Sequence, residues 1–166
     1  MRIYLATDHA GFYLKEKVKA FLKGEGYDVV DLGAESYDKD DDYPVFIGRA
    51  AESVSKDLGS RGIVFGGSGQ GEAMVANRFS GVRCALFYAP CVAMSAIDVT
   101  GKRSDDSFEM LRLTRAHNDS NMLSLSARFL KEEEAIAAVK IFLESPFSGS
   151  ARHKRRIDMI EMVVKS

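Results

Sequence analysis

The feature that most constrains this chain is a glycine-rich loop between an apolar run and a helix-like segment. Residues 62–65 read as a strand, glycines follow at positions 66, 67, 69 and 71, and a helical pattern starts at Glu72. Glycine lets the main chain adopt positive φ and approach a ligand closely. Free N–H groups at the start of a helix attract negative charge. We therefore expect an anion-binding turn with Glu72 placed to move a proton; a simple tight turn is the alternative.

Apolar runs alternate with helical patterns along the whole chain. Strands are predicted at 2–7, 28–33, 62–65, 82–88 and 122–126, and helices at 10–22, 45–58, from 72 onward, at 131–144 and at 150–164. This alternation is typical of an α/β fold with a mostly parallel five-stranded sheet covered on both faces. Residues 97–110 break the regularity between two helix-like stretches, and either an exposed loop or a helical extension fits them.

Composition indicates an ordinary globular protein with one domain, residues 1–166. Hydrophobic residues make up 46% and charged residues 28% of the chain. No apolar run approaches the roughly 20 residues that cross a bilayer, and Asp8 comes too early for a signal peptide. Cys84 and Cys91 have no metal-binding spacing. We therefore expect a cytoplasmic protein, and its net charge of −1 favours neither nucleic acid nor membrane as a partner.

Polar residues follow the predicted first and third strands, and ligands bind at the carboxyl ends of parallel strands. Asp8, His9 and the glycine loop are therefore expected to converge. Each has a simpler interpretation. Asp8 could only cap the helix that follows. Glu72 could merely interact with the helix dipole, which stabilises the helix by about 0.3–1 kcal/mol. Ser68 could merely form a hydrogen bond with the backbone of its own turn.

The densest positive patch begins the predicted terminal helix. Arg152 and Arg156 are four residues apart and share a helix face, where two guanidinium groups suit a phosphate dianion. Arg128, just after the fifth strand, could join them. A solvated face and a small nucleic-acid footprint are the alternatives. For His117 the default interpretation is a surface or structural histidine.

Other binding motifs are absent or weak. The glycine loop has no Lys-Ser/Thr after its last glycine, and it follows the third strand, so neither a Walker A loop nor a dinucleotide fingerprint is predicted. The acidic run at 38–42 could hold a divalent cation. It lacks the spacing and the glycine of a calcium loop, so a solvated loop is favoured.

Six segments spread along the chain belong together: Asp8–Gly11, Asp42–Pro44, Gly66–Glu72, Ala76–Arg78, His117–Asp119 and Arg152–His153. Taken together, they closely resemble the type B ribose 5-phosphate isomerases, a family that includes galactose 6-phosphate isomerase subunits. The resemblance runs nearly end to end. It implies a three-layer α/β/α Rossmann-like fold and a homodimer, sometimes a dimer of dimers, with active sites built from both subunits. It also implies that ribose 5-phosphate and ribulose 5-phosphate are interconverted without metal or organic cofactor.

The resemblance further implies a role for each motif residue. Glu72 matches the base that moves a proton between carbons 1 and 2. The hole for the enediolate is matched by Ser68 and by the amides of the loop, which include Gly67, Gly69 and Gly71. Sugar binding and ring opening are matched by Asp8 and His117, with Asn118 alongside and Asn77 also among the substrate-binding residues. Phosphate binding is matched by His9, Arg128, Arg152 and Arg156, and His153 has no assigned role.

Two departures from the family pattern are visible. Many relatives place a cysteine base where this chain has Gly66, whereas another branch uses a glutamate after the loop, as Glu72 does here. The stretch 91–116 is longer than the pattern by more than ten residues, so it could reshape the substrate entrance or a dimer contact. A hexose 6-phosphate isomerase of allose or galactose type is therefore a rival. A non-catalytic sugar-phosphate-binding subunit and a nucleotide-binding module are others.

Overall fold

The computed structural model describes residues 1–165 and contains one sheet of five parallel strands. The strands are β1 (Arg2–Thr7), β2 (Asp28–Asp31), β3 (Arg61–Gly66), β4 (Cys84–Phe87) and β5 (Met122–Ser126). Their order across the sheet is β2-β1-β3-β5-β4, and every pairing is parallel. The predicted α/β class with a parallel five-stranded sheet is confirmed.

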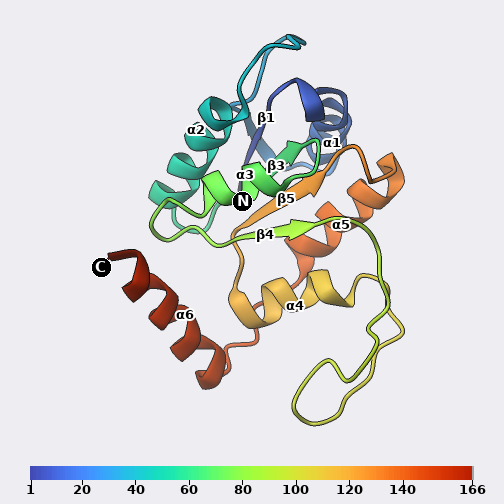
Figure 1. Cartoon of the computed structure of the whole chain (residues 1–166), viewed down its shortest axis with the longest axis vertical. Helices are drawn as coiled ribbons and strands as arrows, with labels where there is room; N and C mark the ends of the chain where they lie inside the picture. The colour runs from blue at the N-terminus through green and yellow to red at the C-terminus, as the bar shows by residue number, and fades with distance from the viewer. Residues whose placement is uncertain (166) are drawn as a thin grey trace.

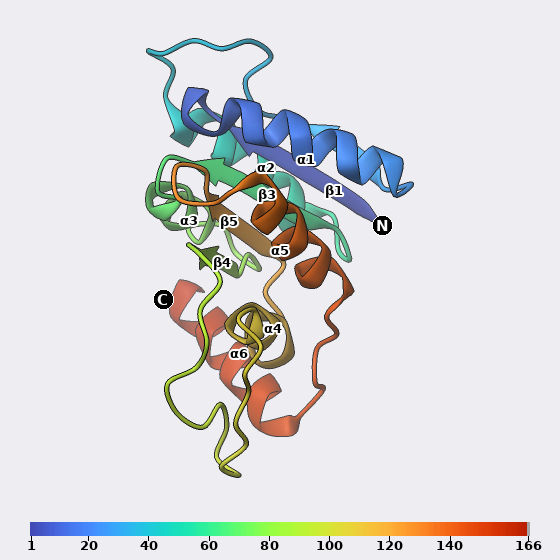
Figure 2. The same ribbon diagram turned by 90° about the vertical axis from the view of Figure 1, so that its right-hand side faces the viewer.

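Helices cover both faces of this sheet (Figure 1). They are a short 3₁₀ turn η1 (His9–Gly11), then α1 (Phe12–Gly24), α2 (Tyr43–Lys56), α3 (Gln70–Ala76), α4 (Glu109–Asn118), α5 (Glu132–Glu144) and α6 (Ala151–Lys165). One buried cluster joins the sheet to α1, α4 and α5, and the other joins it to α2 and α3. Figure 2 shows α1 and α5 together on the face turned toward the viewer. The three-layer α/β/α arrangement is therefore confirmed.

The apolar run of the central strand β3 is unbroken because both faces of this strand are buried. Ile63 and Phe65 belong to the cluster under α1 and α5, and Val64 belongs to the cluster under α2 and α3. Alternate residues of a strand face opposite sides, so a strand covered on both faces needs apolar residues throughout. Each such side chain contributes about 1.5–3 kcal/mol when fully buried. This burial fixes where β3 ends, and hence where the glycine loop begins.

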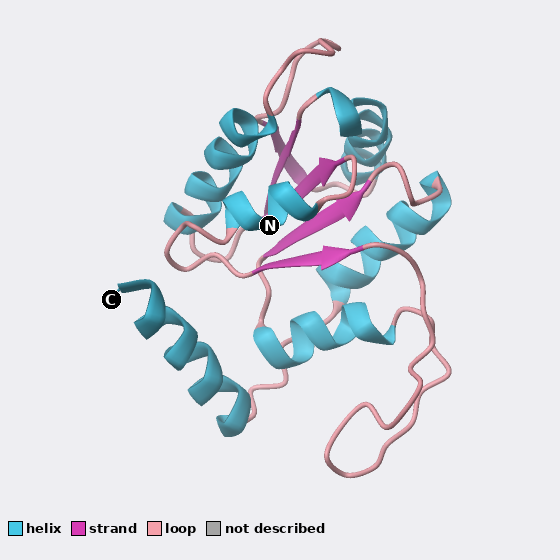
Figure 3. Cartoon of the chain, viewed as in Figure 1, coloured by secondary structure: helices cyan, strands magenta, loops and turns pink. Residues whose placement is uncertain are grey.

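The long segment between β4 and α4 is a loop rather than a helical extension. Residues 88–108 form no helix or strand, and Figure 3 shows them as one extended excursion. The prediction of a helix-like stretch before residue 97 is therefore wrong, and α4 begins only at Glu109. Hydrogen bonds nevertheless join the two sides of the loop tip. The Ile97 N–H donates to the Lys102 carbonyl at 2.7 Å, and Asp98 Oδ1 accepts from the Thr100 N–H at 2.8 Å.

Several other boundaries differ slightly from expectation. Helix α3 begins at Gln70 rather than Glu72, and β4 covers only residues 84–87 of the predicted 82–88. Helix α6 packs beside α4 at the end of the molecule away from α1 (Figure 2). It is also anchored to the turn before β4, where Arg83 Nη1 lies 3.1 Å from Glu161 Oε1. No helix in residues 1–165 is long and apolar enough to span a membrane.

Candidate active site

Glu72 is a buried carboxylate in the first turn of α3, with 5% of its surface exposed. Burial raises the pKa of this carboxyl group, because the charged form loses solvation. A hydrogen bond from its own backbone N–H opposes that rise, and the nearby Asp8 charge adds to it. A carboxylate whose pKa moves toward neutrality is better suited to accept and return a proton near pH 7.

Glu72 opens onto a cavity of about 500 Å³ at the carboxyl ends of the strands. The end of β1, the glycine loop, the start of α2 and the loop after β5 all contribute to it. Its lining residues are Asp8, His9, Ala10, Tyr43, Gly67, Ser68, Gln70, Gly71, Glu72, Met74 and Arg128. Most of the predicted proton-transfer and anion-binding residues therefore lie in one place, hereafter the Glu72 cavity.

Three glycines of the loop each have a different structural reason to lack a side chain. Gly69 adopts φ 75°, which favours glycine, and its carbonyl accepts the Ser124 hydroxyl at 2.7 Å. A Cβ at Gly71 would lie 2.5 Å from the Tyr43 hydroxyl oxygen. A Cβ at Gly67 would lie 3.4 Å from the Arg128 guanidinium. Gly67 and Gly71 thus leave room in the Glu72 cavity, whereas Gly69 shapes the turn from the sheet side.

Asp8 and Ser68 both make the local hydrogen bonds of their simpler interpretations. Asp8 Oδ1 accepts from the Ala10 N–H at 2.9 Å and so caps η1. The Ser68 hydroxyl accepts from the Gln70 N–H at 3.4 Å. Both side chains also line the Glu72 cavity, so neither contact removes them from a ligand.

His9 is held by an acidic residue from the loop before α2. Asp41 Oδ1 lies 2.7 Å from His9 Nδ1 and also accepts from the His9 backbone N–H at 2.9 Å. The hydrogen bond to Asp41 raises the pKa of His9, burial opposes the rise, and the Asp8 charge supports it. Asp8, His9 and Asp41 each place one ligand atom within 4.8 Å of the others, a spacing that a metal ion can bridge.

The remaining predicted residues gather around a second cavity of about 470 Å³, hereafter the Arg152 cavity. It lies between α4, the head of α6 and the long loop. Its lining residues are Ala96, Ile97, Asp98, Val99, Thr100, His117, Ser150, Arg152, His153 and Arg156. The prediction that Arg152 and Arg156 share one face is confirmed. Exposed Asn118 follows His117 directly, and its carbonyl accepts from Arg83 Nε at 3.0 Å.

His117 has a distinctive electrostatic setting in the Arg152 cavity. Its ring centroid lies 4.1 Å from that of His153. Burial lowers the pKa of His117, and the neighbouring His153 and Arg152 lower it further. Asp98, from the tip of the long loop, opposes these effects. The loop thus supplies a carboxylate to a cavity that is otherwise basic.

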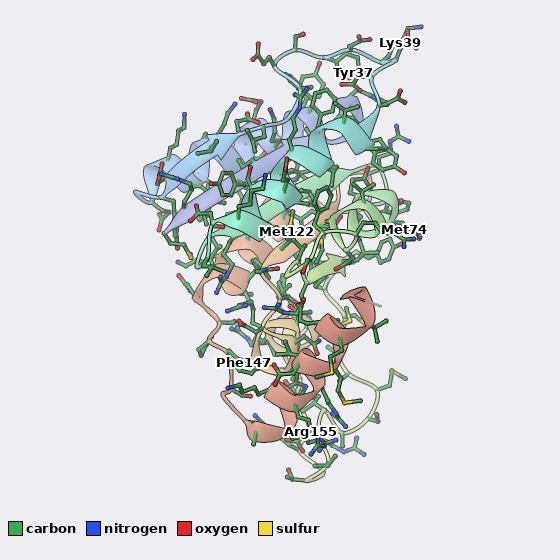
Figure 4. All side chains as sticks on the ribbon, turned by 90° about the vertical axis from the view of Figure 1, so that its left-hand side faces the viewer. Tyr37, Lys39, Met74, Met122, Phe147 and Arg155 are labelled. Carbon is green, nitrogen blue, oxygen red and sulfur yellow. The ribbon has the colours of Figure 1, made fainter. Side chains whose placement is uncertain are left out.

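Within one chain the predicted site is divided. Arg128 lines the Glu72 cavity and does not join Arg152 and Arg156, so the expected grouping of these three arginines is corrected for the single chain. Figure 4 shows Tyr37 and Lys39, in the loop before α2, at the opposite end of the molecule from Arg155 on α6.

Asn77 lies outside both cavities. Its Oδ1 accepts from the Cys84 N–H at 2.8 Å, and its Nδ2 donates to the carbonyls of Ala73 and Cys84 at 2.9 and 3.0 Å. These bonds tie the end of α3 to β4. The structure therefore does not bring Asn77 to the other predicted substrate-binding residues.

Sequence reasoning missed three residues of the Glu72 cavity or its wall, Asp41, Tyr43 and Met74, and it considered only the backbone amide of Gln70. Tyr43 lies in the segment Asp42–Pro44, to which the family resemblance assigns no role. Asp41 lies in the acidic run for which the sequence favours a solvated loop, and only the folded loop shows that it contacts His9. Gln70 and Met74 carry no signal beyond their closeness to the glycine loop.

A buried carboxylate beside a glycine turn, with cationic side chains facing the same cavity, defines a class of α/β protein suited to proton transfer on a small anionic ligand. A family model described as Ribose/Galactose Isomerase matches residues 3–101 and 106–160. The chain belongs to that family.

Individual relatives agree with this assignment. Ribose-5-phosphate isomerase B of Mycolicibacterium paratuberculosis is 41% identical over 160 residues, which cover 96% of this chain and 89% of the relative. The crystal structure of ribose-5-phosphate isomerase B from Mycoplasma genitalium with bound ribulose-5-phosphate superposes with a TM-score of 0.85. That match is 36% identical and covers 99% of this chain and 97% of the other. The enzyme from Thermotoga maritima gives a TM-score of 0.81 at 37% identity and 97% coverage of both chains.

Proposed function

We propose that the chain is an aldose–ketose isomerase that interconverts ribose 5-phosphate and ribulose 5-phosphate. The observation that carries this proposal is the buried Glu72 carboxylate, whose pKa is raised, at the wall of a cavity beside the glycine loop. The names of the relatives and the ribulose-5-phosphate bound to the Mycoplasma genitalium enzyme support the same reaction.

The proposed chemistry uses the Glu72 cavity for the reacting carbons. Glu72 removes the proton from carbon 2 of the open-chain aldose and returns it to carbon 1, while the hydroxyl proton moves from O2 to O1. Ser68 and the loop amides of Gly67 and Gly71 stabilise the enediolate, and one such donor typically contributes about 10²–10³ in rate. Asp8 and His117 bind the sugar and assist ring opening. The reaction needs neither metal nor organic cofactor.

The phosphate is proposed to bind the cationic side chains at the far end of the substrate. These are His9, Arg128, Arg152 and Arg156. Binding energy from this remote group holds the reacting carbons in place for proton transfer.

We further propose a cytoplasmic homodimer in which the Glu72 cavity of one subunit faces the Arg152 cavity of its partner. Two observations support this. The phosphate-binding residues of one chain are divided between the two cavities. Helix α6 exposes the large apolar side chains Met159, Ile160 and Met162, as a helix does when a partner covers it.

A coupled isomerase assay with the 5-phosphate of ribose and the 6-phosphates of allose and galactose tests the reaction. We expect turnover of the ribose ester and its loss in Glu72→Gln. Preference for a hexose ester would identify the hexose 6-phosphate isomerase instead. Inactivity of the wild-type protein on all three would favour a binding subunit, and near wild-type turnover by Glu72→Gln would remove Glu72 as the base.

A further inference from the structure

We propose that Asp41 is a positioning residue that holds His9 in a fixed orientation and keeps its imidazole doubly protonated. The cationic form of His9 in the Glu72 cavity is thereby favoured. The inference rests on the proposed function for the identity of the ligand, a sugar phosphate. The state of His9 itself does not depend on it.

The orientation follows from two hydrogen bonds to one oxygen. Asp41 Oδ1 accepts from the His9 backbone N–H at 2.9 Å and lies 2.7 Å from Nδ1 of the ring. The short second contact requires a proton on Nδ1, because a carboxylate only accepts. Nε2 is the nitrogen left for a ligand in the cavity that His9 lines. A bond from the second nitrogen of this kind is how proteins commonly fix a histidine ring.

The charge follows from the burial of Asp41. Its side chain is 11% exposed, and its Oδ2 is buried without a hydrogen-bond partner in residues 1–165. A buried carboxylate that lacks partners is costly unless a cation stands beside it. The only ion pair of Asp41 within these residues is the one with His9. The positive charge of the imidazolium form of His9 therefore offsets the free-energy cost of burying the Asp41 carboxylate.

The other groups around His9 do not cancel this effect. The Asp8 carboxylate, at the end of β1, lies 3.8 Å from Nδ1 and also favours the cation. Arg128, from the loop after β5, opposes it, and burial opposes it as well. The Tyr37 ring meets the imidazole edge-on at 6.2 Å. The hydrogen bond to Asp41 is the largest influence, and it raises the pKa of His9.

A cationic His9 beside Arg128 gives the Glu72 cavity two positive groups for one phosphate. Hydrogen bonds from charged donors to phosphate are roughly twice as strong as neutral ones. A neutral His9 could still donate only if its tautomer changed and the bond to Asp41 were lost. Asp41 thus secures both the proton and the direction in which it is offered.

The test compares Asp41→Asn with Asp40→Asn, which removes the same charge from an exposed neighbour that forms an ion pair with Lys39. The pKa of His9 is measured by NMR in the free protein, with His9→Asn used to assign its signal. We expect wild type and Asp40→Asn to titrate above the ordinary value of about 6.5, and Asp41→Asn to lose about tenfold in proton affinity. A wild-type pKa at or below 6.5 would overturn the inference even if Asp41→Asn failed to fold.

Kinetics separate positioning from a merely structural role. For Asp41→Asn we expect KM for ribose 5-phosphate to rise about tenfold near pH 8 and to approach wild type near pH 6, because low pH protonates His9 in both proteins. The value of kcat should change little. A KM defect of equal size at every pH would overturn the inference. A wild-type protein inactive on all sugar phosphates would instead refute the proposed function, and the NMR titration would still decide the state of His9.

Discussion

The Glu72 carboxylate occupies the space that a side chain at Gly66 would fill. A Cβ built on Gly66 would lie 1.9 Å from Cδ of Glu72 and 2.0 and 2.2 Å from its two oxygens. Contacts below 3.0 Å essentially never occur for a real Cβ. Gly66, the last residue of β3, therefore leaves the space that the side chain of Glu72, six positions later, occupies. The same contact explains why a cysteine at the head of the loop and an inward-facing glutamate after it are alternatives.

Gly66→Ala should therefore displace Glu72 and inactivate the enzyme without unfolding it. We expect kcat to fall by about 10²-fold or more, since the loss of a positioned base typically costs 10²–10⁴. The matched control is Gly48→Ala in α2, where the new Cβ would lie 3.7 Å from Phe79 Cζ, an ordinary contact. Circular dichroism and turnover of both variants decide the matter, and a Gly66→Ala protein with normal kcat would contradict the packing argument.

Glu72→Gln should stabilise the fold at neutral pH while it abolishes turnover. Burial raises the pKa of Glu72 in the folded state above its unfolded value. The stability that this group contributes is then fully present below the unfolded pKa and is lost as pH rises through the folded pKa. A neutral glutamine avoids that loss. Thermal denaturation should show a higher Tm than wild type near pH 7 and a smaller difference near pH 4; a lower Tm at pH 7 would be the contrary result.

The parts of the site that were predictable from the sequence are those set by neighbouring residues and strand ends. Asp8, Ser68 and Glu72 follow apolar runs that form parallel strands, and such strands end at one edge. Arg152 and Arg156 share a face because a helix repeats every 3.6 residues.

What could not be predicted depends on how distant elements pack. Arg128 follows β5, and only the strand order, with β5 beside β3, places it in the Glu72 cavity. From the sequence alone, the side-chain amide of Asn77 could bind substrate. In the structure it forms hydrogen bonds with the backbone of Cys84 in β4 instead. The partnership of Asp41 and His9 joins residues 32 positions apart through a loop with no periodic pattern.

Asp98→Asn should lower the pKa of His117 and tighten phosphate binding. The Asp98 carboxylate opposes the lowering caused by burial, His153 and Arg152, so its removal lets the pKa fall further. It also removes a negative charge from the Arg152 cavity, so KM should fall a few-fold at low salt and less at high salt. Asp105→Asn, elsewhere in the same loop, is the control. Unchanged His117 titration and KM would show that the loop tip is electrically remote from this cavity.

Exhaustive chelation should leave isomerase activity unchanged. Asp8, His9 and Asp41 are close enough to hold a metal ion, but the ion pair between His9 and Asp41 already engages Nδ1 of the ring and one oxygen of the carboxylate. The assay compares turnover before and after dialysis against a chelator. Loss of activity that returns with a divalent cation would assign a metal to these three residues and displace the ion pair.

Mixing two impaired variants at low substrate concentration should restore activity if each active site uses both subunits. Glu72→Gln damages one cavity and Arg152→Ala the other, and these cavities contain different residues of one chain. In a mixed dimer one site carries both defects and the other carries none, because a two-fold axis relates them. Random reassortment of equal amounts should therefore recover about one quarter of wild-type sites. Glu72→Gln mixed with Ser68→Ala, in the same cavity, is the control, since every mixed site keeps one defect. Equal activity in both mixtures would mean that each chain builds its site alone.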